Sequence, residues 1–476
     1  RKDFIELCLK TLREILPPFV DDWKKLGISC DYENTYSTID GNSRKVSQRY
    51  FIDAFKKGLV YRKDFPTIWD VVFQTPVAQA ELEDKETETL FSTLKFSMKD
   101  SKESILIATT RPELLGACVA VFVNPKDKKH LHLVGKRAVV PIFNHDVPII
   151  ADSSADMEKG TGILMVCSYG DKYDVDAVLR HKLKPRVILN GNGMLNIFPY
   201  EGISVKEARK KILEELKSRN LIAEQKKIRH FVNVYEKSGA EIEFLPTEQW
   251  FFKILDFRKD LIKKAKEINW LPEHMLKRYE NWVNGLDWDW AISRERHFGV
   301  PIPVWHCRKC DVVILAKESE LPIDPTSIRK KCPKCGETAL PEEKVLDTWA
   351  TSSLTPQIAS GIFGNKVKIP YSLRPQGHDI IRTWAFYTIA RSLLHEKKIP
   401  WKDIFITGNV TLKGEKMSKS KGNAISPQEI LEKYGADALR YWAASSKLGD
   451  DFEYQEKDII TGKRLVTKLL NAANFV

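Results

Sequence analysis

The chain has 476 residues, of which 43% are apolar, and this is enough for two to four domains with ordinary hydrophobic cores. No apolar stretch approaches the ~20 residues of a membrane helix, and no signal-peptide pattern opens the chain, so we expect a soluble cytoplasmic protein without a membrane partner. The net charge of +12 suits a polyanionic partner but does not require one.

The first 60 residues have the pattern of helices. Apolar residues at helical spacing over Phe4–Ile15 predict one helix, which Pro17 and Pro18 should end. A second helix is predicted over about Arg44–Lys57, stopped by Gly58.

Between about residues 86 and 245 the pattern changes to short apolar runs rich in β-branched residues, which predicts a separate β-rich domain. The expected strands are Ile105–Ala108, Val119–Val123, Ala138–Ile142, Val147–Ile150, Ile163–Cys167 and Val187–Leu189. A charged amphipathic helix with a solvated face is expected over residues 205–230.

Two short motifs flank strands of this β-rich region. Ala108–Glu113 (Ala-Thr-Thr-Arg-Pro-Glu) leaves the first strand and turns at Pro112, and Lys159–Gly162 (Lys-Gly-Thr-Gly) enters a later one. Asp171 and Asp174 follow. Ordinary turns would explain either motif if it stood alone.

Four of the eight cysteines form two Cys-x-x-Cys pairs separated by 21 residues. The four are Cys307, Cys310, Cys332 and Cys335. This spacing is typical of a zinc ribbon in which all four coordination positions are protein sulfur, so the metal would be structural. A redox role is the alternative, and the absence of a thioredoxin-like βαβ pattern argues against it.

Beyond the ribbon, Gly377-His378-Asp379 precedes an apolar helix expected over Ile380–Leu394. A glycine before an aspartate at a strand end allows close approach to a ribose, whose hydroxyls can donate to the carboxylate. A turn that satisfies its own hydrogen bonds is the alternative. A strand is expected next, over Ile404–Thr407.

Residues 414–423 (Gly-Glu-Lys-Met-Ser-Lys-Ser-Lys-Gly-Asn) place three lysines, Lys416, Lys419 and Lys421, between two glycines. The glycines give a backbone able to close over a ligand, and the lysines suit the charge of a leaving pyrophosphate. A solvated basic turn is the alternative for composition alone.

The Lys-Met-Ser-Lys-Ser string resembles the signature of class I aminoacyl-tRNA synthetases, and the other motifs occur in that family's order over essentially the whole chain. The resemblance implies an α/β fold: an incomplete Rossmann-type catalytic domain with an inserted β-rich editing domain, a zinc ribbon and a C-terminal helical segment. The implied domains are a helical connection of the catalytic domain (1–85), the editing domain (86–245), catalytic domain (246–300), the zinc ribbon (301–345), the second half of the Rossmann fold (346–410), the lysine loop with a stem-contact region (411–458) and the start of an anticodon-binding helical domain (459–476).

The resemblance also implies roles for residues of the catalytic domain. Lys416 and Lys419 would stabilise the transition-state phosphates of ATP, which Mg²⁺ would accompany. Trp349 and Trp384 would line the amino-acid pocket, although core packing is the commoner fate of tryptophan. The ATP-binding residues would be Gly377, His378, Asp379, Lys416, Met417, Ser418, Lys419 and Ser420.

In the inserted domain the resemblance implies hydrolysis of the ester of a wrong amino acid on tRNA. Such a reaction needs an anion for the substrate ammonium and donors for the terminal adenosine. Asp174 matches the family's ammonium-binding aspartate, and Asp171 is a further candidate. The loop that cradles the substrate would be Thr109, Thr110 and Arg111.

The chain departs from the family pattern at several places. Asp70 and Phe73 stand where some members have zinc-binding cysteines, so we expect no metal there. Leu114 and Met165 replace a threonine and a lysine of other members, which leaves the contacts of the editing pocket open. None of the ten histidines lies in the family's His-x-Gly-His element, and the first residue is Arg1, so we expect a fragment of a longer protein.

Within the family, three segments resemble the valyl enzymes of archaeal type, with the isoleucyl enzymes as the alternative: Gln74–Glu81, Thr109–Leu115 and Asp347–Ser353. The implied substrates are valine, ATP and tRNA(Val), with editing of threonyl-tRNA(Val), in a monomer. Because the His-x-Gly-His element is missing, an editing-only deacylase or a non-catalytic tRNA-binding fragment is the alternative from another class.

Overall fold

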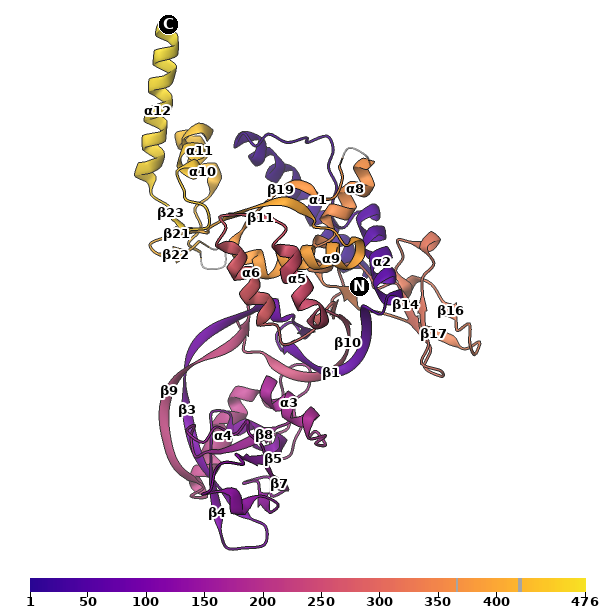
Figure 1. Ribbon diagram of the computed structural model, residues 1–476, viewed down its shortest axis with the longest axis vertical. Coiled ribbons are helices and arrows are strands. Elements are labelled where there is room, and N and C mark those ends of the chain that lie inside the picture. The colour runs from indigo at the N-terminus through magenta and orange to yellow at the C-terminus, as the bar shows by residue number, and fades with distance from the viewer. Residues whose placement is uncertain (365–366, 418–421) are drawn as a thin grey trace. The chain divides into compact units, whose positions relative to one another are not determined.

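The computed structural model describes residues 1–364, 367–417 and 422–476. It forms two compact units, one of Arg1–Tyr61 with Phe251–Val476 and one of Arg62–Trp250 (Figure 1). The chain leaves the first unit within β1 (Val60–Asp70) and returns within β10 (Glu243–Phe252). The predicted domain limits within these units stay a prediction. Among the described residues, no helix has the length and apolar character to cross a membrane.

A three-stranded parallel sheet organises the first unit, with strand order β11-β20-β19. Its strands are β11 (Asn269–Leu271), β19 (Tyr371–Gly377) and β20 (Trp401–Thr407), and α9 (Phe386–Glu396) connects the last two. Ile404 and Ile406 on β20 are fully buried, as expected for a parallel strand covered on both faces. The predicted α/β fold is confirmed.

The connection from β19 into α9 is irregular. A 3-10 turn (His378–Ile380) and a π-helical turn (Ile381–Ala385) come before the regular helix. The predicted helix over Ile380–Leu394 is therefore present, but its first turns are not α-helical. π-helical turns are frequent at functional sites, and this one carries Trp384.

The N-terminal helices differ from the prediction in one respect. α1 (Lys2–Lys25) continues through Pro17 and Pro18, so the expected break is wrong. All residues of α1 are described and each is at least partly exposed, so the carbonyls freed by the prolines can bond water. α2 (Gly41–Lys56) is close to the prediction, and Asp40 caps it by accepting from the Ser43 N–H.

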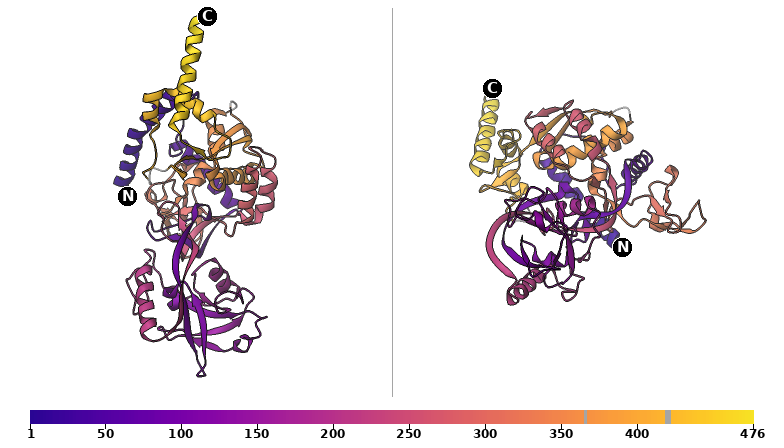
Figure 2. Two further views of the ribbon diagram at one scale, coloured as in Figure 1. Left: turned by 90° about the vertical axis from the view of Figure 1, so that its left-hand side faces the viewer. Right: turned by 60° about the horizontal axis from the view of Figure 1, so that its bottom comes forward.

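The first unit also contains further helices and short strands. The helices are α5 (Arg258–Ala265), α6 (Met275–Asn284), α7 (Thr348–Ser352), α8 (Thr355–Phe363), α10 (Pro427–Tyr434), α11 (Ala436–Ala444) and α12 (Glu456–Phe475). β12 (Trp290–Ala291) pairs with the end of β10, and β13 (Ser293–Arg294) pairs with β18 (Val345–Leu346). Ile459 and Gly462 of α12 are buried and the helix extends away from the rest of its unit (Figure 2).

A small antiparallel sheet carries the two Cys-x-x-Cys pairs, with strand order β15-β14-β17-β16. Its strands are β14 (Val304–His306), β15 (Val313–Leu315), β16 (Lys330–Lys331) and β17 (Thr338–Pro341). Each cysteine pair lies in a turn between two of these strands, as in a zinc ribbon.

After β20 the chain forms a hairpin of β21 (Val410–Leu412) and β22 (Glu415–Lys416). β23 (Phe452–Glu453) pairs with β21 in parallel, far along the sequence. This three-stranded arrangement holds the base of the lysine-rich segment.

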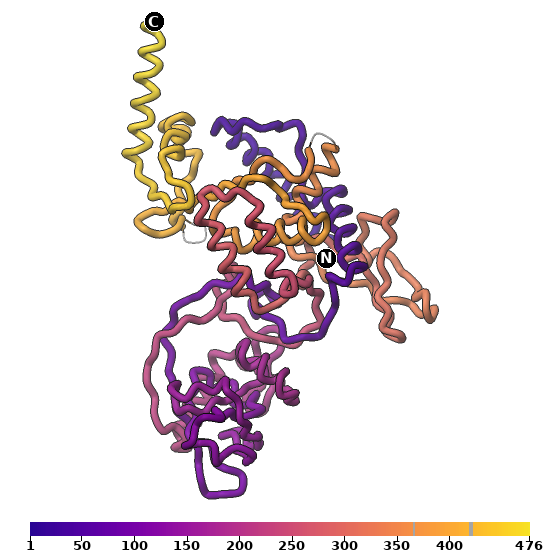
Figure 3. The backbone as a smooth tube through the Cα atoms, in the orientation of Figure 1, coloured from indigo at the N-terminus to yellow at the C-terminus, as the bar shows by residue number. Residues whose placement is uncertain are grey.

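The second unit is β-rich, as predicted. Two long antiparallel strands, β3 (Leu82–Met98) and β9 (Ile222–Tyr235), run side by side along its length (Figure 3). The further strands are β2 (Thr75–Pro76), β4 (Ser104–Thr109), β5 (Cys118–Val123), β6 (Arg137–Val139), β7 (Asp146–Ala151) and β8 (Ile163–Cys167), and the helices are α3 (Lys172–Arg180) and α4 (Val205–Ser218).

Two predictions in this unit are wrong. The helix expected over 205–230 ends with Ser218, because Asn220 takes a positive φ of 55° that ends the turn and the chain continues as β9. The strand expected at Val187–Leu189 is only an isolated bridge between Leu189 and Leu195. The strand β9 forms by pairing with β3, which is distant in sequence, and the bridge at Leu189 is irregular. Local sequence pattern predicts neither feature.

Candidate functional site

The first candidate site lies at the carboxyl ends of β19 and β20, where parallel sheets bind ligands. Gly377 ends β19, and a Cβ placed on it would lie 2.6 Å from Oδ1 of Asp379. The glycine therefore permits the carboxylate to fold back over the strand end. The Nζ atom of Lys416 lies 2.8 Å from Oδ2 of Asp379.

This contact joins the two motifs that the sequence predicted separately. Burial alone would raise the pKa of Asp379, but the hydrogen bond and charge of Lys416 lower it below its usual range, so the carboxylate stays ionised. Met417 continues the hairpin through its N–H, which donates to the Val410 carbonyl at 3.0 Å. Predicted positions that lie outside the described residues are Ser418, Lys419 and Ser420.

His378, the middle residue of the Gly-His-Asp motif, faces the neighbouring segment. Its Nε2 lies 2.6 Å from Oδ1 of Asp451, and Nδ2 of Asn409 lies 3.3 Å from the same nitrogen. Asp451 also accepts from the Asn409 N–H at 2.7 Å. Sequence reasoning missed Asp451, because no local motif marks it.

The two tryptophans predicted for an amino-acid pocket lie on neighbouring turns. Trp349 is partly buried on α7, and Trp384 is partly buried on the π-helical turn. The Trp384 Nε1–H donates to the Ser352 carbonyl of α7 at 3.1 Å. The Arg374 guanidinium lies 3.4 Å from the centre of the Trp384 ring.

Arg374 was not predicted as part of this site. Its guanidinium also lies 4.7 Å from the Trp401 ring centre, and burial lowers its pKa to about 10. One face of Trp384 is therefore occupied by a cation, in a cation–π contact that desolvation strengthens. The position of Arg374 on β19, three residues before Gly377, was the only signal in the sequence.

The second candidate site lies in the second unit, where the predicted loop of Thr109, Thr110 and Arg111 lies near the segment that carries Asp171 and Asp174. The Arg111 Nη1–H donates to the Gly170 carbonyl at 3.1 Å, and the Cys167 thiol donates to the Leu114 carbonyl at 3.4 Å. The loop after β4 therefore contacts the turn that leads into α3. At the end of β4, the hydroxyl oxygen of Thr109 accepts from the Arg111 N–H at 3.0 Å.

Asp174 is the acidic group of this site. Its Oδ1 accepts from the Cys167 N–H at 3.0 Å. Burial, and then the charge of Asp171, raise the pKa of Asp174 well above its usual range. A Cβ on Gly170 would lie 2.4 Å from Oδ2 of Asp174, so only glycine leaves room for the carboxylate. A cationic group such as an ammonium would stabilise the ionised form of this carboxyl group, so the site is suited to bind one.

Asp171 has a structural role in the described fold. It caps α3 by accepting from the Tyr173 and Asp174 N–H groups at 2.8 and 2.9 Å. This is a standard helix N-cap. Its carboxylate is thus engaged by backbone donors, while its charge acts on Asp174.

Arg111 is also held by the protein itself. Its Nη2 lies 2.8 Å from both carboxylate oxygens of Glu243, and its Nε lies 3.0 Å from Oε1 of Glu113. Arg209 of α4 binds the other side of Glu113 at 2.8 and 2.9 Å. Sequence reasoning missed Glu243 as a partner, since it is 132 residues from Arg111.

Thr110 of the predicted loop lies beside a cavity of about 230 Å³. The other lining residues are Glu88, Thr89, Leu90, Pro112, Arg209, Leu213 and Lys227.

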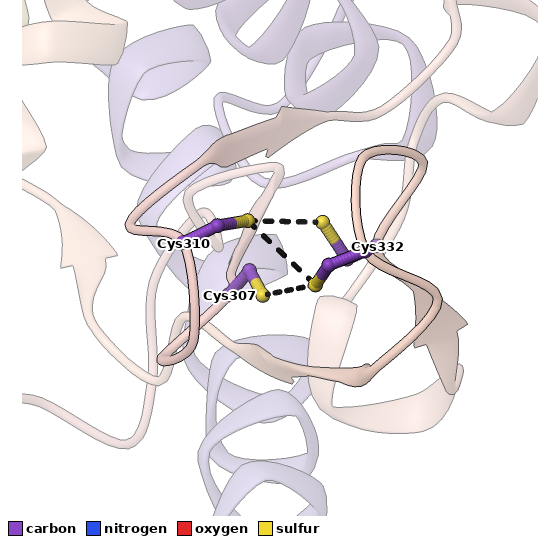
Figure 4. A group of neighbouring side chains, drawn as sticks. Cys307, Cys310 and Cys332 are labelled. Carbon is purple, nitrogen blue, oxygen red and sulfur yellow. Dashed lines mark hydrogen bonds between the residues drawn. The ribbon is translucent and has the colours of Figure 1, made fainter.

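The four ribbon cysteines come together as the spacing predicted (Figure 4). The Sγ atoms of Cys307 and Cys335 are 3.4 Å apart, and Cys310 lies 3.5 Å from Cys332 and 3.7 Å from Cys335. A tetrahedral zinc site with bonds of about 2.3 Å needs sulfur atoms about 3.8 Å apart. The cluster can therefore hold a metal ion of this kind. By contrast, Asp70 accepts from the Phe73 N–H and the Ser238 hydroxyl, in a structural turn.

Comparison with known proteins shows the family of this chain. Residues 1–455 match the family model "tRNA synthetases class I (I, L, M and V)". Curated valine–tRNA ligases from Thermoplasma acidophilum, Methanocaldococcus jannaschii and Rickettsia typhi are 46%, 45% and 44% identical over the whole chain. The chain spans 61%, 55% and 60% of the length of these three relatives.

Among solved structures, the Agrobacterium radiobacter K84 agnB2 LeuRS-tRNA-LeuAMS ternary complex matches 97% of this chain and 64% of its own, with a TM-score of 0.51 and 18% identity. At that identity the likeness concerns the fold alone. Together with the family match over nearly all residues, it confirms the predicted fold. The chain belongs to the class I tRNA synthetases of the I, L, M and V group.

Proposed function

We propose that this chain is part of a valine–tRNA ligase, which activates valine with ATP and transfers it to tRNA(Val). The observation that carries the proposal is the identity of 42–46% to curated valine–tRNA ligases over the whole chain. The three segments that resemble valyl enzymes support valine over isoleucine. We further propose that the protein works as a monomer.

The catalytic proposal assigns the strand-end site of the first unit to ATP. Gly377 and Asp379 would hold the ribose, and His378 would border it. Lys416, with Lys419, would neutralise charge that develops on the phosphates when the valine carboxylate attacks the α-phosphorus. Mg²⁺ bound with ATP would supply further charge neutralisation at the phosphates.

The ion pair of Lys416 and Asp379, at 2.8 Å, bears on how ATP would bind. Binding of ATP would exchange this pair for ribose and phosphate contacts. Both partners are about half exposed, with side-chain exposures of 51% and 42%, so the exchange costs little. Met417, Ser418 and Ser420 would complete the loop over the nucleotide.

For the amino acid, we propose that Trp349 and Trp384 form the walls of the valine pocket. The Trp384–Ser352 hydrogen bond and the stacked Arg374 fix the orientation of the Trp384 ring. A rigid aromatic wall excludes larger side chains, but an apolar pocket cannot strongly reject an isosteric hydroxyl, and the known discrimination of valyl enzymes against threonine is only ~100-fold. This gives a physical reason for an editing site.

We propose that the second unit supplies that editing activity. Asp174 would bind the ammonium of a misplaced threonine on tRNA(Val), because an amine cation offsets the cost of its buried charge. Thr110 and the backbone around Thr109 would contact the terminal adenosine. Arg111 and Asp171 would support these groups from behind, as their contacts within the protein indicate.

The cysteine cluster of Cys307, Cys310, Cys332 and Cys335 is proposed to bind one structural Zn²⁺. The donor set of four thiolates favours zinc, and leaves no open position for a substrate. Its sulfur separations are close to those of tetrahedral geometry.

Valine-dependent exchange of pyrophosphate into ATP tests the ligase proposal. The full-length gene product should catalyse it with valine and not with isoleucine, and its absence with every amino acid would refute the ligase function. A polypeptide of the 476 residues alone should show little exchange, because it lacks the His-x-Gly-His element, yet should hydrolyse threonyl-tRNA(Val). An editing-only deacylase, the second candidate, predicts hydrolysis but no exchange for the full-length product as well.

A further inference from the structure

Two carboxylates at β23, those of Asp451 and Glu453, bind the hairpin of β21 and β22 that carries Lys416, which we call the lysine hairpin. They lie about 40 residues away from it along the chain. Phe452 donates its N–H to the Asn409 carbonyl, and Tyr454 donates to the Thr411 carbonyl, both at 2.8 Å. A Cβ on Gly408 would lie only 1.8 Å from the Asp450 carbonyl oxygen. The two backbone segments are therefore in close contact, and any movement of one displaces the other.

Glu453 binds the hairpin turn with both carboxylate oxygens. Its Oε1 accepts from the Lys413 N–H at 2.5 Å, and its Oε2 accepts from the Thr411 hydroxyl at 2.5 Å and the Gly414 N–H at 3.3 Å. These donors lower the pKa of Glu453, so it stays ionised. The contacts fix the turn that leads directly into Lys416.

Asp451 binds the other motif of the same site. Two donors, His378 Nε2 at 2.6 Å and the Asn409 N–H at 2.7 Å, meet its oxygen Oδ1. His378 is the neighbour of Asp379, whose carboxylate pairs with Lys416. A closed ring of contacts thus runs from Asp379 through Lys416 and the hairpin to β23, and back through His378.

We infer that Asp451 and Glu453 are positioning residues for valine activation, which fix Lys416 and His378 relative to the bound nucleotide. This inference rests on the proposed ligase function. β23 lies between α11 and α12 in the chain, so the same two carboxylates connect the C-terminal helices to the nucleotide site. A shift of the Lys416 charge by about 1 Å from its productive position costs on the order of 100-fold in rate.

The geometry predicts different results for matched variants of the full-length gene product. D451A removes both bonds at Oδ1 and should lower kcat of valine-dependent pyrophosphate exchange by about 100-fold. D451N keeps an oxygen at that place and should retain nearly all activity. E453A should resemble D451A, whereas E453Q, which keeps one accepting oxygen, should lie between E453A and the wild type.

Asp450 provides the matched control. It is a neighbouring acidic residue whose carboxylate pairs with Lys447 at 2.8 Å. D450N should leave exchange unchanged. In D451A and E453A the KM for valine and the hydrolysis of threonyl-tRNA(Val) should also be unchanged, since neither uses the hairpin.

Three results would overturn the inference: wild-type exchange in D451A and E453A, equal losses in D451N and D451A, or a parallel loss of deacylation that marks general misfolding. The ligase proposal fails separately, when the wild-type product has no valine-dependent exchange.

Discussion

Replacement of Arg111 is the sharpest test of the arrangement in the second unit. Its guanidinium neutralises the carboxylate of Glu243, which is 4% exposed and accepts from Arg111 with both oxygens. Glu113, 0% exposed, keeps Arg209 when Arg111 is lost. R111A therefore leaves chiefly one buried carboxylate without its cation, which costs about 3–5 kcal/mol of unfolding free energy.

Amide hydrogen exchange of the whole chain during urea unfolding measures this cost for peptides of residues 62–250. R111K keeps the charge but loses the bidentate geometry, and should cost about 1–3 kcal/mol. The double variant R111A/E243Q should recover part of the loss, because it removes the uncompensated charge.

The exposed pair of Arg137 and Asp146 provides the control, with side-chain exposures of 44% and 33%. R137A should cost less than about 1 kcal/mol. The reasoning is refuted if R111A unfolds within about 0.5 kcal/mol of the wild type, or if the double variant is no more stable than R111A. Retained stability with lost deacylation would instead place Arg111 in contact with substrate.

Three further predictions concern other parts of the chain. Because the pKa of Asp174 is raised in the folded state, this group lowers the free energy of unfolding as pH rises from about 4 through the folded pKa. D174N should remove this pH dependence in urea titrations and lower threonyl-tRNA(Val) hydrolysis by about 100-fold or more. Unchanged hydrolysis would exclude Asp174 from the site. His395 is buried and its pKa is lowered to about 3, so the free energy of unfolding should fall by about 1.4 kcal/mol per pH unit on acidification below 6.5. H395Q should reduce this pH dependence between pH 6.5 and 4.5. The same pH dependence in H395Q and the wild type would show that His395 does not cause it. Metal analysis of purified protein should give about one zinc per chain, with loss of the ion in C332S, and a zinc content of zero would refute the ribbon proposal.

Much of the candidate site could be predicted from short strings. Gly377-His378-Asp379, the lysine segment, the Cys-x-x-Cys pairs and the Thr-Thr-Arg-Pro loop each combine residue types that suit one chemistry at a fixed local spacing. The order of these motifs also predicted the family and the α/β fold, which the comparisons confirm. Spacing of this kind is a local property, so the sequence reports it directly.

The tertiary structure decided which partner each of these residues has. Arg111 looked like a substrate contact, but Glu243, 132 residues away, occupies its guanidinium. Trp384 proved to be covered by Arg374, and the lysine hairpin to be held by Asp451 and Glu453. These contacts depend on distant strands and turns that meet only in the folded chain.

Some secondary-structure elements could likewise be predicted from local pattern, whereas others depend on the tertiary structure. The helix predicted over about Arg44–Lys57 and most apolar strands of the second unit could be recognised from local pattern. The length of β9 and the continuation of α1 through two prolines could not. Pairing with β3 determines the length of β9, and solvent exposure permits α1 to continue through its prolines. The sequence by itself therefore determined the motifs and their chemistry. Long-range packing determined which partners neutralise the charges of these motifs and hold them in place.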